Sequence, residues 1–284
     1  MEHNNLSNMS NDPNKLIYIV GLGHSGTTLL NLMLGSNSQT FGTGEAFKYF
    51  HQRKNLFLKG MGCTCQKDIE ECEFWSNVER NIFSDPTLTE KEYIKEFTEY
   101  VIKFTKKGQV IVDSSKNLSF LDELKNIKNI DLQVLFIIKD VRAWCYSIIN
   151  KALKLNRFNK FKHNYFWLFR CWFVSNKKIE NFLLENKITF KTITYEELCL
   201  YPRETLIELC DFVGVDFEEA MTKPNRIEQH FINGNRMRFS DSSIIEVNYD
   251  DSWKKIWKWK NASKVLRRIM RYNDKIQSKR HHDN

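Results

Sequence analysis

Residues 18–35, YIVGLGHSGTTLLNLMLG, place glycines and hydroxyl side chains between an apolar run and a helical pattern. Gly21, Gly23 and Gly26 expose backbone N–H groups at the start of the predicted helix, where the helix dipole also favours negative charge. Three neighbouring hydroxyl groups can donate further hydrogen bonds to the same anion: those of Ser25, Thr27 and Thr28. The types and spacing of these residues therefore predict a loop that binds an oxyanion.

This loop lacks the lysine of nucleotide-hydrolysing loops. In the pattern G-x-x-x-x-G-K-[ST], the lysine bridges the β- and γ-phosphates while a Ser or Thr holds Mg²⁺. Here Gly21 and Gly26 are followed by Thr27, and the nearest basic side chain, His24, precedes Gly26. A loop of this kind suits a less charged group without a metal ion. A tight strand-to-helix turn that binds no ligand would explain the same residues.

Two other segments have basic residues at a spacing suited to anion binding. In KDVRAWCYS, Lys139 ends a predicted strand and Ser147 lies about two helical turns later, so both can reach one phosphate, with Arg142 near the helix start. In HFINGNRMRF, a Gly-Asn turn carries Arg236 and Arg238. That turn is either a surface β-turn or a clamp that closes over an anion.

The chain of 284 residues has a net charge of +8 and a pI of about 9.0, which favours an anionic ligand, a nucleic acid or a membrane surface as partner. Lysine and arginine dominate residues 253–284, where Trp253, Trp257 and Trp259 lie among them. This tail is either a contact for nucleic acid or lipid, or a terminal amphipathic helix. We favour the helix, because helical periodicity places five apolar residues on one core-facing side: Ile256, Val265, Leu266, Ile269 and Met270.

Composition limits the class of protein. Hydrophobic residues make up 42% of the chain, which is enough for a sizeable core. No apolar run approaches the ~18 residues of a transmembrane helix, and no secretory signal is visible. We therefore expect a cytoplasmic protein without a transmembrane segment. Residues 1–14 should form a flexible N-terminus, residues 15–275 a single domain and residues 276–284 a polar C-terminal tail.

Three of the seven cysteines cluster in CTCQKDIEEC, at positions Cys63, Cys65 and Cys72. A zinc site is conceivable, but C-x-C followed by one distant cysteine is not a standard finger spacing, and the sequence identifies no fourth ligand. We favour a structural role for these residues as small buried thiols. A disulfide from Cys72 to Cys63 or Cys65 is the alternative.

Predicted strands and helices alternate along the chain, which indicates a doubly wound parallel sheet. The regions 46–108 and 150–187 have helical, aromatic-rich patterns and should cover the sheet rather than form separate domains. Strands are expected at 15–20, 109–115 and 132–140 and, leading into a helix, within 188–198; helices are expected at 25–34 and 141–155. Ligands bind at the carboxyl ends of such strands, and the polar residues there are His24, Ser25, Asp113, Ser114, Ser115, Lys116, Lys139, Asp140, Tyr195 and Glu196.

The segments GLGHSGTTLL, KDVRAWCYS, TYEELCLYP and GNRMRF followed by SW occur in the order found in sulfotransferases. CTCQKDIEECEFW and VDSSKNLSF resemble the bacterial and carbohydrate-type branch of that family, and the resemblance extends from residue 17 to residue 257. It implies an α/β fold with a P-loop-like parallel sheet, helices on both faces and helical insertions. It also implies transfer of a sulfuryl group from 3′-phosphoadenosine-5′-phosphosulfate (PAPS) to a hydroxyl or amine, without a metal.

The resemblance assigns roles to particular residues. The loop, comprising Gly23, His24, Ser25, Gly26, Thr27 and Thr28, would bind the 5′-phosphosulfate. Lys139 and Ser147 would bind the 3′-phosphate, and Tyr195 would lie near the adenine. Asn235, Arg236 and Arg238 would close over the same 3′-phosphate.

A catalytic base is expected at Glu45 of FGTGEAF, where related sulfotransferases place a glutamate. A glutamate at a helix N-terminus would also be favoured there by the dipole alone. The reserve candidates for the base are His51, Asp113 and His230.

The sequence departs from the family at two positions. His24 stands where lysine or arginine is usual before the loop serine, so it carries full charge only when protonated. Lys139 stands where arginine is usual, which keeps the charge but loses the bidentate geometry. Lys116 of DSSK is a candidate to replace the missing charge beside the leaving oxygen.

Other functions remain open at this level. A P-loop-type small-molecule kinase needs Mg²⁺ and the loop lysine, which neither Thr27 nor His24 supplies. A non-catalytic protein could bind nucleic acid or membrane through the basic tail, or bind the donor without transferring its sulfuryl group. We expect a small-molecule or carbohydrate acceptor and no nucleic-acid partner; the sequence does not indicate the oligomeric state.

Overall fold

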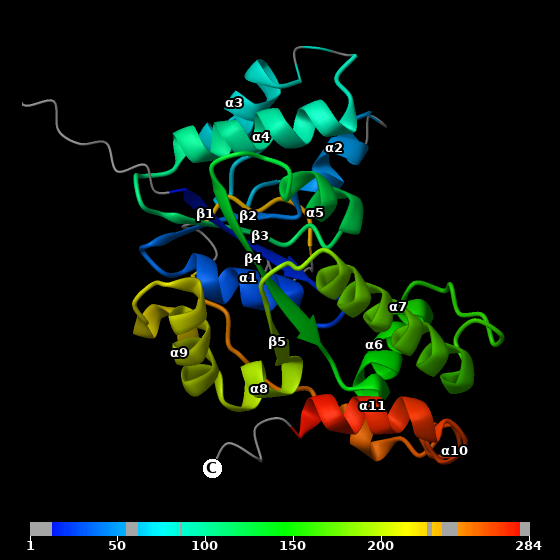
Figure 1. Ribbon diagram of the computed structural model, residues 1–284. Coiled ribbons are helices and arrows are strands. Elements are labelled where there is room, and N and C mark those ends of the chain that lie inside the picture. Colours follow the sequence, from blue (N-terminus) through cyan, green and yellow to red (C-terminus); the bar gives the residue numbers. More distant parts are fainter. Residues whose placement is uncertain are drawn as a thin grey trace, which may run out of the picture.

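Five parallel strands form a sheet at the centre of the computed structural model (Figure 1). Their order is β2-β3-β1-β4-β5, so the chain moves from β1 to the edge strand β2, returns through β3, and then crosses to the other side of β1. The strands are β1 (Asn14–Val20), β2 (Thr40–Gly44), β3 (Val110–Asp113), β4 (Ile130–Ile138) and β5 (Phe190–Thr194). The structure describes residues 13–54, 62–83, 85, 87–225, 229–234 and 244–278.

The central strand β1 pairs with two neighbours, and its register brings their ends together. Tyr18 is opposite Asp113 of β3 on one side and Val134 of β4 on the other. The connection after β1 runs to one side of this strand and the connection after β3 crosses to its other side, so the carboxyl end of β1 lies at the switch point where parallel sheets bind ligands. The loop that follows β1 therefore occupies the position that the sequence predicted for the functional site.

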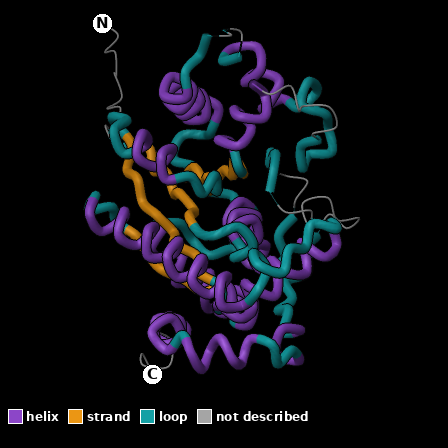
Figure 2. The backbone as a smooth tube through the Cα atoms, turned by 90° about the vertical axis from the view of Figure 1, so that its right-hand side faces the viewer, coloured by secondary structure: helices purple, strands orange, loops and turns teal. Residues whose placement is uncertain are grey.

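Alternate residues of the strands face two apolar layers. Ile17 and Ile19 of β1 are fully buried against one layer, formed by α1, α8, α9 and η1. Leu16 and Tyr18 face the other layer, which α2–α7, α10 and α11 form. Figure 2 shows the strands lying between helices. Because both faces are covered, β1 and β4 end in continuous apolar runs instead of alternating polar and apolar residues.

The helices follow the expected alternation. In Figure 1, α3 and α4 lie at the opposite end of the molecule from α10 and α11. None of the helices in the described part of the chain has the length and apolar content needed to cross a membrane. The helices are α1 (Thr27–Gly35), α2 (Ala46–Lys54), α3 (Glu73–Asn81), α4 (Glu90–Phe104), α5 (Leu118–Leu124), α6 (Val141–Lys154), α7 (Tyr165–Glu185), α8 (Tyr195–Leu200), α9 (Pro202–Val213), α10 (Trp259–Val265) and α11 (Arg267–Gln277), with 3₁₀ turns η1 (Glu219–Thr222) and η3 (Ser252–Lys255).

The predicted α/β fold is confirmed, but the sequence pattern missed one strand. β2 has the sequence TFGTG, whose two glycines and lack of a β-branched run hide it from pattern analysis. Gly42 is required here because a side chain would overlap the ring of Phe231. A glycine inside a strand thus marks a close approach by another part of the chain.

The basic tail differs from the single amphipathic helix that was predicted. It forms η3, α10 and α11, and the chain bends between the last two at Leu266, whose φ of −92° and ψ of 52° are not helical. This bend places Ile269 in the core but leaves Val265 67% exposed, so the prediction for Val265 is wrong. Helix α11 continues to Gln277, past the predicted boundary at residue 275.

One buried amide fixes helix α11 to the start of α6, just after β4. Asn273 is 0% exposed; its Oδ1 accepts a hydrogen bond from Val141 N at 2.9 Å and its Nδ2 donates to Asp140 Oδ2 at 3.1 Å. Asp140 also accepts hydrogen bonds from the guanidinium of Arg142, which lies against the Trp253 and Trp259 rings. Arg142 therefore joins the tail to α6.

The Asn273→Ala substitution should lower the free energy of unfolding by about 1–3 kcal/mol, because it leaves the buried Val141 N–H without a partner. Urea denaturation of the purified protein measures this change. The exposed Lys275→Ala change on the same helix is the matched control and should stay within about 0.5 kcal/mol. Equal urea midpoints for the two variants would show that the amide does not anchor α11.

Candidate active site

The loop between β1 and α1 is shaped by two glycines that tolerate no side chain. A methyl group at Gly21 would overlap the carbonyl oxygen of Ile137 in β4. Gly26 has a φ of +96° and is the N-cap of α1, and a methyl group there would lie 2.7 Å from Cδ2 of Tyr195. No side chain caps α1 at Gly26. The start of this helix therefore faces the loop with its backbone groups, as an anion site requires.

Ser25 supplies a second indication of a ligand at this loop. Its side chain is fully buried, and its hydroxyl has no hydrogen-bond partner in the described part of the chain. A buried hydroxyl without a partner is rare in folded proteins, because losing its hydrogen bonds to water carries a free-energy penalty. Thr27 and Thr28 are buried beside it. An oxyanion held by the loop would satisfy the Ser25 hydroxyl.

His24 lies next to this buried serine in the left-handed backbone conformation, with a φ of +72°. Its Nε2 is 3.3 Å from Nζ of Lys151 in α6. Burial first, and then the positive charges of Lys151, Lys116 and Lys139, together lower the pKa of His24 to about 4. The imidazole is therefore neutral near pH 7.

The structure brings together Lys139 and Ser147, as the helical spacing predicted. Lys139 Nζ lies 3.4 Å from Ser147 Oγ and 3.9 Å from the centre of the Tyr195 ring, and its backbone carbonyl accepts a hydrogen bond from Trp172. The side chain is almost fully buried, and burial lowers the pKa of its ammonium. Glu196, the first of the acidic groups that oppose this shift, has its own pKa raised to about 7 by burial. Near neutral pH the charge of Lys139 is thus only partly balanced.

Glu45 and Lys116 form an ion pair beside the loop. Lys116 Nζ is 2.5 Å from Glu45 Oε1, and Glu45 is only 7% exposed. Glu45 immediately precedes α2, and Lys116 follows β3 with a φ of +63°. A carboxylate that lies against an ammonium in a nearly dry site can accept a proton while its partner donates hydrogen bonds.

The segment that carries the predicted arginine clamp begins beside the first turn of α1. A methyl group at Gly234 would lie 3.1 Å from Thr28 Oγ1 and 3.6 Å from Glu45 Oε1. Asn233 is 6% exposed, and its side-chain nitrogen has no partner among the described residues. The predicted ligands Asn235, Arg236 and Arg238 lie outside the described residues.

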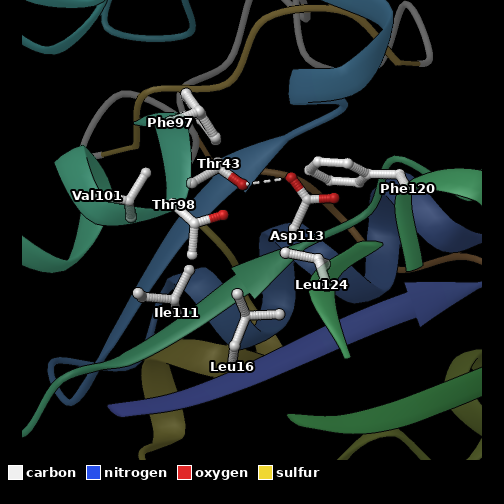
Figure 3. A pocket seen from close by; sticks show the side chains of 9 residues that line it. All are labelled: Leu16, Thr43, Phe97, Thr98, Val101, Ile111, Asp113, Phe120 and Leu124. Atoms are coloured by element: carbon white, nitrogen blue, oxygen red, sulfur yellow. Dashed lines mark hydrogen bonds between the residues drawn. The ribbon is translucent and has the colours of Figure 1, made fainter. Parts of the chain in front are cut away.

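The three reserve candidates for the base lie elsewhere. His51 pairs with Glu90 at 3.5 Å, and His230 lies against Cys72. Asp113 accepts hydrogen bonds from Thr43 Oγ1 and Ser115 N, and burial raises its pKa to about 6. Asp113 lines a small, mostly apolar cavity beneath α4 (Figure 3). The volume of this cavity is about 10 Å³. That space holds about one water, not a substrate.

Sequence reasoning missed two residues that support the loop. Trp144 donates a hydrogen bond from Nε1 to the carbonyl of Gly23 at 2.8 Å, and Lys151 lies against His24. Lys151 follows Ser147 by one helical turn, so the periodicity of α6 already placed both on one face. The contact of Trp144 with Gly23 depends on how α6 packs against the loop, and no sequence pattern indicates it.

Comparison with solved structures shows the same architecture in sulfotransferase domains. The sulfotransferase domain from the curacin biosynthetic pathway is similar over 90% of this chain and 98% of its own, with a TM-score of 0.59 and 18% identity. The sulfotransferase domain of the Synechococcus PCC 7002 olefin synthase is similar over 94% and 95% respectively, with a TM-score of 0.51 and 18% identity. At such low identity these likenesses establish the fold alone.

The family is established by the sequence. No curated protein matches this chain. Residues 17–219, well over half of the 284, match the model of the sulfotransferase family, and this segment contains the loop, Glu45, Lys116, Lys139 and Ser147. The chain therefore belongs to the sulfotransferase family.

Proposed function

We propose that the protein transfers a sulfuryl group from PAPS to a hydroxyl or amine of a small-molecule or carbohydrate acceptor, with no metal at the reacting atoms. Family membership supports sulfuryl transfer in general. The observation that carries the choice of donor is the buried ammonium of Lys139, which lies against the Ser147 hydroxyl and the Tyr195 ring. A 3′-phosphate distinguishes PAPS from other adenine nucleotides and requires a separate cationic site of this kind.

The loop without a lysine suits the 5′ end of this donor. A sulfuryl group carries less charge than a γ-phosphoryl group. Backbone N–H groups and hydroxyls can therefore stabilise it without a metal ion or further cations. The buried hydroxyl of Ser25 and the uncapped start of α1 supply such donors. Trp144 donates a hydrogen bond to the carbonyl of Gly23 and so helps to hold the loop in place.

Tyr195 links the two anion sites. Its ring lies against Gly26 of the loop and beneath the ammonium of Lys139. We propose that the adenosine of the donor spans this distance, with the 5′ side at Ser25 and the 3′-phosphate at Lys139. The phosphate would then supply the negative charge that Glu196 provides only in part at neutral pH.

The reaction breaks the bond between the sulfur and the bridging oxygen of the donor and forms a bond between that sulfur and the acceptor oxygen or nitrogen. We propose that Glu45 takes the acceptor proton, while Lys116 donates a hydrogen bond to the bridging oxygen as negative charge develops there. His24 is neutral and contributes a hydrogen bond instead of a full charge. The departing product keeps the electron pair as adenosine-3′,5′-bisphosphate (PAP).

The alternatives find less support in the structure. A kinase would need a lysine at Thr27, and Mg²⁺-dependent turnover of ATP would revive that function. The basic tail packs on the domain through buried Ile269 and Ile276, so its apolar side is used within the fold. Several apolar side chains between residues 153 and 167, just after Lys151, are exposed. We therefore include apolar alcohols, in addition to sugars, among the acceptors to be tested.

Lys139→Met should weaken PAP binding by about 10- to 150-fold, the value of a hydrogen bond to a charged group, while leaving AMP binding unchanged. Calorimetry with both ligands separates the 3′-phosphate contribution from the rest of the nucleotide. Lys178→Met, an exposed lysine of α7, is the control and should behave as wild type. Equal losses for PAP and AMP, or equal affinity of the wild type for the two, would refute the 3′-phosphate site.

Glu45→Gln should lower the rate of transfer by about 10²- to 10⁴-fold, because the acceptor proton loses its base, while PAP affinity changes little. The measurement is transfer of labelled sulfate from PAPS to a panel of hydroxylated sugars, phenols and alcohols. The exposed Glu99→Gln change in α4 should keep wild-type activity. Glu45→Gln with an undiminished rate would exclude this carboxylate as the base, and wild-type protein inactive on the whole panel would count against catalysis itself.

The pKa of His24 should be about 4 in the free protein and should rise when PAP binds, because an anion offsets the burial and the nearby lysines. NMR titration of the imidazole measures both values, and Lys151→Gln should raise the pKa while Lys178→Gln leaves it unchanged. Since folding lowers this pKa, His24 stabilises the fold above about pH 6.5 and loses that contribution as the pH falls toward 4. A pKa near 6.5 without ligand would contradict the proposed neutral role.

A further inference from the structure

A second cluster of reactive side chains lies outside the loop and takes no part in the proposed transfer. Three thiols come from the turn that precedes α3, and one imidazole comes from a segment far along the chain. Their potential ligand atoms all lie within 4.8 Å of one another. The members of this cysteine–histidine cluster are Cys63, Cys65, Cys72 and His230.

The distances within the cluster match those around a tetrahedral ion. His230 Nδ1 lies 3.2 Å from Cys72 Sγ and 3.9 Å from Cys63 Sγ. With Zn–S of ≈2.3 Å and Zn–N of ≈2.0–2.1 Å, tetrahedral geometry requires about 3.6 Å between nitrogen and sulfur and about 3.8 Å between two sulfurs. The observed distances lie on either side of the nitrogen–sulfur value.

A backbone N–H group also lies near each sulfur. The N–H groups of Cys65, Lys67 and Trp75 favour the thiolate forms of Cys63, Cys65 and Cys72 respectively. Cys72 is in addition the N-cap of α3, where the helix dipole favours negative charge. Backbone donors aimed at every sulfur are the arrangement that stabilises thiolates, which are the form that binds metal.

The imidazole is held in a fixed orientation toward the thiols. The His230 ring lies among Phe41, Phe74 and Phe104, and its backbone carbonyl accepts a hydrogen bond from Trp75 Nε1 at 2.7 Å. The sequence alone could not identify this fourth ligand, because 158 positions separate it from Cys72. Cys63 and Cys72 are buried, whereas Cys65 and His230 are half-buried. Apolar rings beside the imidazole favour a structural site over a catalytic one.

We propose that the cysteine–histidine cluster binds one structural Zn²⁺ ion. Three thiolates and a neutral imidazole form a soft, tetrahedral ligand set that suits zinc and leaves no open position for a reacting water. Binding forms three Zn–S bonds and one Zn–N bond and releases the three thiol protons to solvent. This zinc site lies apart from the loop and leaves the transfer reaction free of metal.

The position of the ion explains what it would stabilise. It joins the turn before α3 to residues 229–232, where Thr64 also bonds Gln229 and Phe231. Ile232 next pairs with Gly44 and accepts a hydrogen bond from Glu45 N. The zinc would thus hold in place the segment that reaches Glu45 and Thr28. The consequence for donor binding rests on the proposed function, whereas zinc binding does not.

Zinc analysis of protein purified without added metal, after gel filtration with a chelator of moderate strength, should give about one Zn²⁺ per chain. X-ray absorption should show three sulfurs at about 2.3 Å and one nitrogen at about 2.0–2.1 Å. Cys65→Ser and His230→Ala should each lower the zinc content at least several-fold, while Cys171→Ser, a thiol of α7 outside the cluster, should retain it.

Four results would overturn the proposal. Metal-free protein with a Cys63–Cys72 or Cys65–Cys72 disulfide by mass spectrometry would establish the redox alternative, and metal-free protein with three reactive thiols would show that the cluster binds no zinc. Full zinc content in both ligand variants would show adventitious metal. If the variants do not fold, the spectrum of cobalt-substituted wild type decides: tetrahedral thiolate bands are expected, and their absence refutes the site. Zinc content without any transferase activity would leave this site standing and remove only the proposed function.

Discussion

The buried ammonium group of Lys139 is the feature on which the rest of the site depends. Lys139 is 5% exposed, and removing a charge from water carries a free-energy penalty unless an opposite charge or strong hydrogen bonds replace the water. The Tyr195 ring and Ser147 hydroxyl compensate in part, and Glu196 resists ionisation for the same reason that Lys139 does. An anion bound beside Lys139, as proposed above, would replace the lost water, and Tyr195 connects this position to the loop after β1.

Positive charge also surrounds the loop, although the loop itself contains no lysine. Three lysines lower the pKa of His24: Lys151 of α6, Lys116 after β3 and Lys139 after β4. The positive charge near the loop therefore comes from the surrounding elements and not from the loop itself. An anion held by the loop N–H groups and hydroxyls, as proposed above, would therefore lie near positive charge without a lysine in the loop. Because the charges are distributed, an imidazole next to Ser25 stays neutral, and a permanent cation at that position would repel its neighbours.

How much of this could be predicted from the sequence depends on the range of each contact. Lys139 and Ser147 lie within one strand–helix unit, so helical geometry alone brought them together. The sheet was predictable from apolar runs, except for β2, whose glycines serve the packing of Phe231. Glu45 and Lys116 were separately chosen as candidates, but their ion pair depends on the pairing of β2 with β3 and on the left-handed backbone at Lys116. Val265 was misplaced because a bend at Leu266 interrupts the helical period.

The contacts of longest range unite the catalytic candidates with the cysteine–histidine cluster. Residues 229–234 pass from His230 at the cluster to Gly234 above Thr28, with Phe231 packed on Gly42 and Ile232 beside Gly44. Residues 229–234 form no helix or strand of their own, so the position of this segment depends on side-chain contacts and on its few backbone hydrogen bonds. A covalently ligated imidazole would fix one end of it at a small entropic penalty. Geometry at Glu45, where a displacement of about 1 Å can lower a rate strongly, would then depend on a site that never touches the substrate.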